Sequence, residues 1–391
     1  MKTFKKFSYL LFIACFISCK QENRNTIITV KNPLNFERTA EVIEIKTSSL
    51  HIDDVATIGI KNQETNELQV TQLVDLDGDG TMDHVLFQPK VAANAIASFE
   101  VITITAAEQP KAENLCYSRF VPERTDDYTW ENDQVAFRVF GPNAQYRAEN
   151  NLSEPTLSSG VDAWLKRVEY PIINKWYKNY MAQKSYHEDR GEGLDNFHVG
   201  TSRGVGGIAV KEGSTYYFSK NYTKWRTITT GPLRTSFYLE YADWDANGKT
   251  ITESKIVTLD LGSNLSKFET KITGTATISA GLTLHEKDGE VVGNKKNGWI
   301  SYWQPHADSE LGTAIVAAKN TFLDFEKYDV ATKDLSNAYA HLKVAANSTS
   351  YYAGFTWAKS NQFSSKKEWE AYLNMFSKQI NNPLEVAIHN K

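Results

Sequence analysis

Apolar and polar residues alternate along most of this chain with the two-residue period of β-strands. In the first part of the chain the clearest segments are residues 27–30, 41–45 and 99–104, which are rich in β-branched side chains. Comparable segments follow at residues 136–140, 215–218 and 236–241, and turn sequences at 246–249 and 287–290 separate strands in hairpin fashion. The pattern predicts a mostly β protein, with a small N-terminal β-sandwich-like region at residues 26–107 and a larger β-sandwich at residues 115–391.

One segment near the end of the chain has the period of a helix instead. Trp369, Tyr372, Leu373 and Phe376 recur at the spacing of one helical face, and Ser365 can cap the first turn. We therefore expect one amphipathic helix there, and a linker at residues 108–111 between the two β regions.

The N-terminus has the layout of a secretory signal. Three lysines at positions 2, 5 and 6 precede the apolar residues 7–17, a run shorter than the roughly 20 residues that span a bilayer. Residues 16–19 resemble a bacterial lipobox, whose cysteine (here Cys19) receives the lipid, and hydrophilic residues continue to position 25 as a tether. We expect residues 1–18 to be a lipoprotein signal peptide and Cys19 to anchor an exported protein to a membrane, in the periplasm or at the cell surface. Plain secretion is the alternative.

Composition supports a folded domain and narrows its partners. Of the 391 residues 41% are hydrophobic and 12% aromatic, enough for a packed core. The formal net charge of −4 becomes −7 without the three lysines of the signal, so nucleic acid is not an expected partner. Once the signal is removed and Cys19 is lipidated, Cys116 is the remaining cysteine. It cannot form an internal disulfide, and we expect it to be a small buried residue.

Residues 75–83 have the spacing of a calcium-binding loop. Asp75, Asp77, Asp79 and Asp83 take positions 1, 3, 5 and 9, and Gly80 takes position 6. Position 12 is Leu86, where an EF-hand has a bidentate glutamate, and no flanking helices are predicted. The loop is therefore either a structural Ca²⁺ site or a polar hairpin between two strands.

The segment from residue 185 to 207 carries the strongest functional signal. It combines histidines, carboxylates, arginines and glycines, and it fits neither a strand nor a helix. Glycine lets the backbone approach a ligand closely, and polar loops on a rigid β scaffold often carry binding or catalytic residues. The candidates for proton transfer and substrate contact are Tyr186, His187, His198, Arg190 and Arg203, with Asp189 placed to orient a histidine. A solvated loop without function is the alternative.

Aromatic and basic residues elsewhere suit a sugar ring, because aromatic faces stack on it and guanidinium groups grip a carboxylate or sulfate. The first such cluster, at residues 122–133, contains Arg124, Tyr128 and Trp130, and a second covers residues 162–167 and 175–177. Trp303, His306 and His285 are weaker candidates for the same cleft. Each of these residues also fits the edge of a core.

Several stretches together resemble a known family: Asn32-Pro33-Leu34 with Arg38, the loop 75–83, and residues 130–138, 159–167, 186–207 and 352–355. The family consists of exported bacterial proteins labelled as a domain of unknown function. Its genes are common in polysaccharide-utilising marine bacteria, and it includes the ulvan oligosaccharide dehydratase. The resemblance implies a galactose-mutarotase-like β-supersandwich for the larger region, which would be the catalytic domain, and a role in carbohydrate degradation.

Taken with the residues, the resemblance predicts a dehydratase, a carbon–oxygen lyase. It would remove water from the unsaturated uronic acid at the non-reducing end of anionic oligosaccharides from ulvan-type polysaccharide breakdown. His187 would be the base, His198 or Tyr186 the acid, and Arg203 or Arg124 the carboxylate clamp. The chemistry requires no cofactor. A polysaccharide lyase or sugar epimerase of the same fold, and a glycan-binding lipoprotein, are the alternatives.

Overall fold

The computed structural model describes residues 26–390 with the exception of residue 333. The predicted signal peptide, tether and lipidation site at Cys19 lie outside these residues. Within the described chain, no helix is long and apolar enough to cross a membrane.

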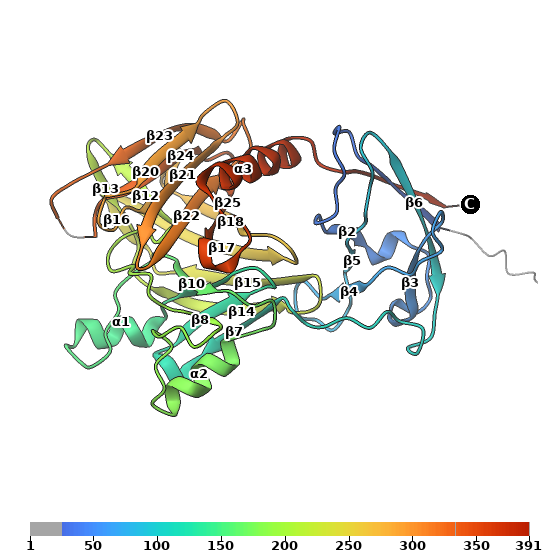
Figure 1. Ribbon diagram of the computed structural model, residues 1–391, viewed down its shortest axis with the longest axis horizontal. Coiled ribbons are helices and arrows are strands. Elements are labelled where there is room, and N and C mark those ends of the chain that lie inside the picture. Colours follow the sequence, from blue (N-terminus) through green and yellow to red (C-terminus); the bar gives the residue numbers. More distant parts are fainter. Residues whose placement is uncertain (1–25, 333, 391) are drawn as a thin grey trace, which may run out of the picture.

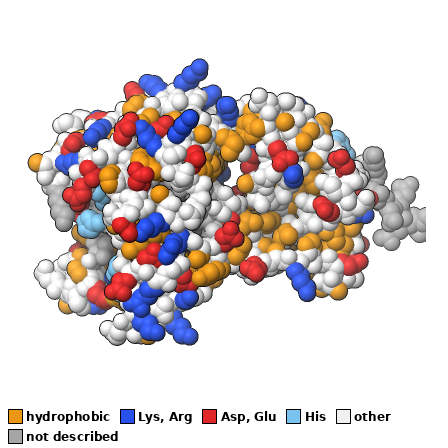
Figure 2. Space-filling model, in the orientation of Figure 1, with side chains coloured by type: hydrophobic (Ala, Val, Ile, Leu, Met, Phe, Trp, Pro, Cys, Tyr) orange, Lys and Arg blue, Asp and Glu red, His pale blue; other side chains and the backbone are white. Residues whose placement is uncertain are grey.

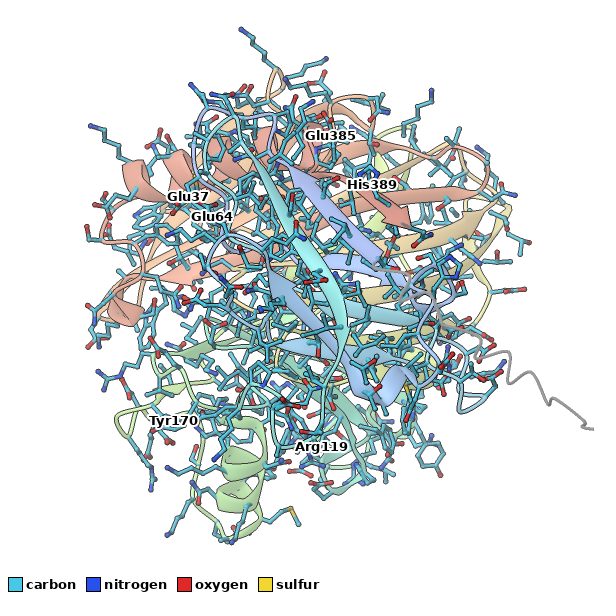
Figure 3. The ribbon with its side chains drawn as sticks, turned by 90° about the vertical axis from the view of Figure 1, so that its right-hand side faces the viewer. Glu37, Glu64, Arg119, Tyr170, Glu385 and His389 are labelled. Atoms are coloured by element: carbon cyan, nitrogen blue, oxygen red, sulfur yellow. The ribbon has the colours of Figure 1, made fainter. Side chains whose placement is uncertain are left out.

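The N-terminal region is built from two antiparallel sheets (Figure 1). The four-stranded sheet has the order β26-β1-β6-β3, and the three-stranded sheet has the order β2-β5-β4. The strands are β1 (Thr26–Lys31), β2 (Ile43–Lys46), β3 (Ile58–Asn62), β4 (Thr71–Val74), β5 (His84–Phe87), β6 (Ile96–Thr103) and β26 (Glu385–Asn390), with the 3₁₀ turns η1 (Thr47–Ser49) and η2 (Val55–Thr57). The last strand of the chain thus completes a sheet of the N-terminal region by pairing with β1, and Figure 3 labels Glu385 and His389 on it.

The larger region contains three further antiparallel sheets. One five-stranded sheet has the order β11-β10-β9-β8-β7, with β7 (Tyr117–Val121), β8 (Asp127–Glu131), β9 (Ala136–Val139), β10 (Asp162–Lys166) and β11 (Gly193–Leu194). A second has the order β13-β12-β19-β24-β23, with β12 (Val205–Glu212), β13 (Thr215–Tyr217), β19 (Thr277–Thr283), β23 (Phe322–Tyr328) and β24 (Asn337–Lys343).

The third and largest sheet has the order β14-β15-β17-β18-β25-β22-β21-β20, and β16 pairs with β17. Its strands are β14 (Tyr222–Thr229), β15 (Arg234–Tyr241), β16 (Trp244–Ala246), β17 (Lys249–Asp260), β18 (Leu265–Thr273), β20 (Glu290–Asn294), β21 (Trp299–His306), β22 (Ser309–Val316) and β25 (Ser348–Trp357). One continuous hydrophobic core, with Phe137, Phe237, Phe268 and Phe355 among its members, draws residues from all three sheets. The expected mostly β sandwich architecture is confirmed.

In the described part of the chain, three helices and two further 3₁₀ turns accompany these sheets: α1 (Pro142–Glu149), α2 (Ile173–Met181), α3 (Lys366–Asn381), η3 (Pro122–Arg124) and η4 (Ala358–Ser360). The helix expected near the C-terminus is confirmed as α3. Ser365 caps it through Glu368 N–H, and Trp369 and Leu373 are buried. Helices α1 and α2 were not predicted, because eight or nine residues are too short to display a helical period clearly.

The two regions contact each other through polar side chains. The amide nitrogen of Gln72 on β4 donates to Thr229 Oγ1 at 2.8 Å and to the carbonyl of Arg234 at 2.9 Å. Arg234 in turn donates to Glu44 Oε2 at 2.7 Å. Cys116 is buried and free, as expected from the sequence.

Candidate functional site

A cleft of about 660 Å³ opens on the larger region, between the sheet that contains β9 and β10 and the loop that follows β11. The loop residues 195–201, the segment 155–157 after α1, and Asp334 line its walls, while Arg138 and Asp162 line it from the two neighbouring strands. Histidine side chains reach the surface on the left side of Figure 2, the end of the molecule formed by the larger region. The cleft is therefore framed by part of the segment that carried the strongest sequence signal.

Arg138 is the centre of a buried charge cluster beneath this cleft. It lies directly opposite Asp162 in the β9–β10 pairing, so the two side chains leave the sheet on the same face. Its Nε and Nη2 donate to Asp162 Oδ2 at 2.9 and 2.5 Å, and Nη2 also donates to Asp195 Oδ2 at 2.9 Å. Asp127 Oδ2 lies 3.8 Å from Nη1. One guanidinium thus holds three carboxyl groups from three different segments.

Burial and mutual repulsion shift the acid–base equilibria of this cluster. Burial raises the pKa of Asp127 to about 6, and burial together with the charge of Asp195 raises the pKa of Asp162 to about 7. Burial likewise raises the pKa of Asp195. Burial opposes the charge of Arg138, but the neighbouring carboxylates outweigh it and raise its pKa well above the usual value. The cluster therefore takes up protons far more readily than exposed carboxylates do.

Arg124 and Tyr186 connect this cluster to the cleft. The phenol oxygen of Tyr186 accepts from Arg138 Nη1 at 3.2 Å and from Arg124 Nε at 3.4 Å. The Tyr186 ring itself is buried against Trp164, with ring centroids 5.2 Å apart. Arg124, one of the two arginines predicted to bind the carboxylate, is half-buried and lines the cleft, so a ligand in the cleft can contact it.

His187 lies at the edge of the cleft, with 56% of its side chain exposed. Its Nδ1 is within hydrogen-bonding distance of the carbonyl oxygen of Asp195, which can only accept a hydrogen bond. Nδ1 must therefore carry the proton, and in the neutral ring Nε2 keeps a free lone pair. The backbone of Asp195 thus selects the tautomer that a general base requires. The carboxylate of Asp195 lies 3.7 Å from the same Nδ1.

His198 lines the same cleft and is paired with another carboxylate. Its Nε2 lies 3.0 Å from Asp334 Oδ2, and 57% of its side chain is exposed. With Nε2–H donated to Asp334, the doubly protonated ring has Nδ1–H left to donate to a ligand. The structure therefore brings His187, His198 and Arg124 of the predicted site to one cleft.

Two other predicted histidines support this loop from behind. His285 donates from Nε2 to the carbonyl of His198 at 3.0 Å, and its Nδ1 lies 2.9 Å from the amide nitrogen of Gln304. His306 lies 3.1 Å from Asn196 Oδ1. Burial lowers the pKa of His285, and it lowers that of His306 to about 4, so both rings are neutral near pH 7. Both are positioned to fix the loop rather than to transfer protons.

Several predicted binding residues are in the interior, where an oligosaccharide cannot reach them. Arg203 is fully buried: it donates to Ser159 Oγ at 2.8 Å and covers the ring of Phe218 at 3.9 Å. Tyr128 and Trp130 are core residues bonded to neighbouring hydroxyl groups, and Trp303 packs in the cluster beneath α3. The prediction of substrate contact is wrong for these four, because amphipathic side chains serve a core edge equally well.

The remaining predictions in this segment also need correction. Arg190 is exposed and pairs with Glu188 at 2.8 Å, outside the cleft. Asp189 accepts from the backbone N–H groups of Gly191 and Gly193 and from Arg167. It therefore stabilises a turn, and Asp195 takes the place that the sequence suggested for Asp189 beside His187.

Sequence reasoning missed the residues that hold the site together: Asp127, Arg138, Asp162, Asp195 and Asp334. A signal for two of them was available. Arg138 and Asp162 each lie next to apolar residues in strands whose every residue is buried. Because charged residues are almost never fully buried without a partner, such a pattern indicates an internal ion pair.

The acidic loop lies between β4 and β5 of the N-terminal region, far along the sequence from the cleft. Carboxylate oxygens of Asp75, Asp77 and Asp83 can come within 4.8 Å of one another, whereas Asp79 is outside this group and accepts from Thr81 N–H at 2.7 Å. Asp75 accepts from Gly78 and Gly80 N–H, which lowers its pKa. The geometry suits both a cation and a loop held by its own hydrogen bonds.

If the loop holds Ca²⁺, chelation is expected to lower the melting temperature by a few degrees, since a site filled at 100 times its dissociation constant contributes about 2.7 kcal/mol. Differential scanning calorimetry with EDTA or added calcium, at matched ionic strength, measures this. Asp77→Asn is the matched variant, because it removes one ligand charge and should make melting insensitive to chelator. Identical melting of the wild type in both buffers would exclude a calcium site.

Comparison with known proteins places the chain in a family. Residues 30–386 match the family described as "Domain of unknown function (DUF4861)", and the protein belongs to it. "Uncharacterized protein P7" of Formosa agariphila (strain DSM 15362 / KCTC 12365 / LMG 23005 / KMM 3901 / M-2Alg 35-1) is 52% identical over 388 residues, which cover 97% of this chain and 98% of that protein. The resemblance noted in the sequence is thereby confirmed at the level of the family.

Comparison with solved structures gives two weak matches. A protein in glycosyl hydrolase family 38 from Enterococcus faecalis matches 94% of this chain and 48% of its own, with 9% identity and a TM-score of 0.48. An α-mannosidase from Enterococcus faecalis V583 matches 94% and 46%, with 9% identity and a TM-score of 0.45. The chain thus spans about half the length of these proteins, and likeness at this level carries no argument about activity.

Proposed function

We propose that the protein is a dehydratase that removes water from the unsaturated uronic acid at the non-reducing end of oligosaccharides from ulvan-type polysaccharides. The observation that carries the proposal is the joint placement of His187, His198 and Arg124 on one open cleft. An elimination of water needs a base, an acid and a cation for the carboxylate, and each of these residues supplies one of the three.

In the proposed reaction, His187 Nε2 takes a proton from the sugar ring, because Asp195 keeps the proton of the neutral imidazole on Nδ1. His198, held by Asp334, protonates the departing hydroxyl group, which leaves as water while the new carbon–carbon double bond forms. Arg124 holds the carboxylate of the uronic acid. Each proton transfer is expected to contribute about 10²–10⁴ in rate.

The walls of the cleft fit a sugar as well as an acid. Phe140, Pro155 and Leu157 offer apolar surface to a ring face, while the loop 195–201 offers polar backbone and side-chain groups. A binding protein would need these apolar and basic contacts. It would not need one histidine with its tautomer fixed and a second paired with a carboxylate, which is why an enzyme is preferred here.

The test is mass spectrometry of defined oligosaccharides, unsaturated and saturated at the non-reducing end, after incubation with the purified protein. Loss of one water from the unsaturated set alone supports the dehydratase. Chain shortening would show a lyase instead. An unchanged mass would reject both, and NMR of the same samples then separates an epimerase, which alters ring protons, from a binding protein, which does not.

A further inference from the structure

The charge cluster beneath the cleft contains one more carboxylate than it has cations. Asp127, Asp162 and Asp195 converge on Arg138, and Arg124 is the second guanidinium close enough to act on them. When all five side chains are ionised, their net charge is −1. An uncompensated charge out of water is costly, and buried groups relieve this cost by taking up a proton.

Asp162 is the member of the cluster best placed to hold that proton. Both bonds from Arg138 reach the same oxygen, Oδ2. The other oxygen, Oδ1, is buried and has no hydrogen-bond partner within residues 26–332 and 334–390. An ionised carboxylate would leave this oxygen as a charged acceptor without a donor, whereas a protonated carboxyl group carries no charge. The residue is fully buried and yet lines the cleft.

We propose that Asp162 is protonated in the folded protein near neutral pH, and that this proton enables the cleft to take an anionic ligand. With Asp162 neutral, the five-residue cluster has no net charge, and Arg124 can engage a ligand carboxylate without a competing buried anion. With Asp162 ionised, the same ligand would meet an excess negative charge. Binding of the ligand is therefore linked to one proton, which deepens the proposed function and rests on it for the identity of the ligand.

The surroundings of Asp162 agree with this assignment. Burial and the charge of Asp195 raise its pKa to about 7, against the opposing influence of Arg138 and His187. The groups that face it come from every neighbouring element: Asp127 on β8, Arg138 on β9, Arg124 in η3, Tyr177 on α2, and Tyr186, His187 and Asp195 in the loop. Within the described residues Asp127 Oδ1 also has no hydrogen-bond partner, while Tyr177 donates to Asp127 Oδ2 at 3.1 Å. Asp127 does not line the cleft, so of these two carboxyls it is Asp162 that a ligand in the cleft adjoins.

Equilibrium unfolding at several pH values tests the proton without any ligand. The pKa of Asp162 is about 7 in the folded protein and about 3.9 in an unfolded chain, so the folded state holds the extra proton between these values. The stability that this proton contributes is present at low pH and is lost as pH rises towards 7. The unfolding constant of the wild type should therefore rise, relative to that of Asp162→Asn, by about tenfold per pH unit between pH 5 and 6.5.

This comparison separates the proton from a general loss of stability. Asparagine keeps the shape of a neutral carboxyl group. Any strain that it introduces changes the unfolding constant by the same factor at every pH and leaves its slope against pH unchanged. Asp53→Asn, at an exposed position of the N-terminal region, should leave the slope as in the wild type. If the wild type and Asp162→Asn give parallel curves from pH 5 to 8, Asp162 holds no proton and the proposal is overturned.

NMR titration with glucuronate, a saturated uronic acid that cannot be dehydrated in the proposed way, tests the coupling. Wild-type affinity should fall as pH rises from 6 to 8, and more steeply than in Asp162→Asn, in which residue 162 has no proton to lose. Uncharged glucose is the control and should show no such difference. Equal pH dependence in the two proteins overturns the coupling. If both tests succeed and no oligosaccharide loses water, only the dehydratase proposal fails.

Discussion

Replacing Arg138 by methionine is expected to lower the free energy of unfolding at pH 7 by about 3–5 kcal/mol, the usual cost of removing one partner from a buried ion pair. Methionine fills much of the same volume, so the loss is one of charge and hydrogen bonds. Asp162 and Asp195 would lose the donors that they share, and Asp127 would lose its nearest cation. Chemical denaturation measured by fluorescence of the buried tryptophans gives this value directly.

The pH dependence of that loss identifies its cause. Without Arg138 the folded-state pKa values of Asp162 and Asp195 rise further, because the main positive charge that opposes burial and repulsion is gone, and only the weaker influence of His187 on Asp162 and of Arg124 on Asp195 is left. The loss in unfolding free energy reaches its full size at pH values above those raised pKa values. It becomes smaller as pH falls through them, because protonation removes the uncompensated charges. A deficit of the same size at pH 5 and pH 8 would show that packing, not charge, is responsible.

Arg190→Met is the matched control for this experiment. Arg190 pairs with Glu188 on the surface, with 51% of its side chain exposed. Surface ion pairs contribute about 0–1 kcal/mol, so its loss should be small and should depend little on pH. Similar losses for Arg138→Met and Arg190→Met would contradict the central role given to the buried cluster.

The strands and the helix α3 were predictable because their side-chain periods follow from burial of one face. Residues 237–241 alternate between buried and partly exposed positions as a half-buried strand does, residues 27–30 are rich in β-branched side chains, and Trp369 and Leu373 repeat at the helical spacing. The pairing of β26 with β1 was not predictable in this way. It joins residues separated by more than 350 positions, and no local pattern specifies which distant edge a strand will meet.

The candidate site was predictable in its location but not in its chemistry. The loop around His187 and His198 was recognisable because glycines and titratable groups crowd an irregular segment. Arg203 shares that segment and yet points into the core, where Phe218 covers it, because sequence alone does not give the direction of a loop side chain. Asp195 was missed as a partner of His187 because its backbone carbonyl, rather than its side chain, makes the closest contact.

His187→Ala is expected to lower kcat by about 10²–10⁴ while KM changes little. Its Nε2 is the base of the proposed reaction, whereas contact with the substrate carboxylate comes from Arg124. The side chain is more than half exposed, so its removal should change the free energy of unfolding by no more than about 0.5 kcal/mol. Steady-state kinetics with an unsaturated oligosaccharide, beside a melting curve, measure both quantities.

Two companion variants make the assignment specific. His389→Ala removes an exposed histidine of β26, which Figure 3 shows on the N-terminal region, and should leave both kcat and melting unchanged. Arg124→Met should instead act mainly on KM, because a lost charge-assisted contact to a carboxylate costs about 1.5–3 kcal/mol of binding. A folded His187→Ala protein that turns over at more than a tenth of the wild-type rate would remove His187 as the base. His198, paired with Asp334 on the same cleft, would then be the residue to test in that role.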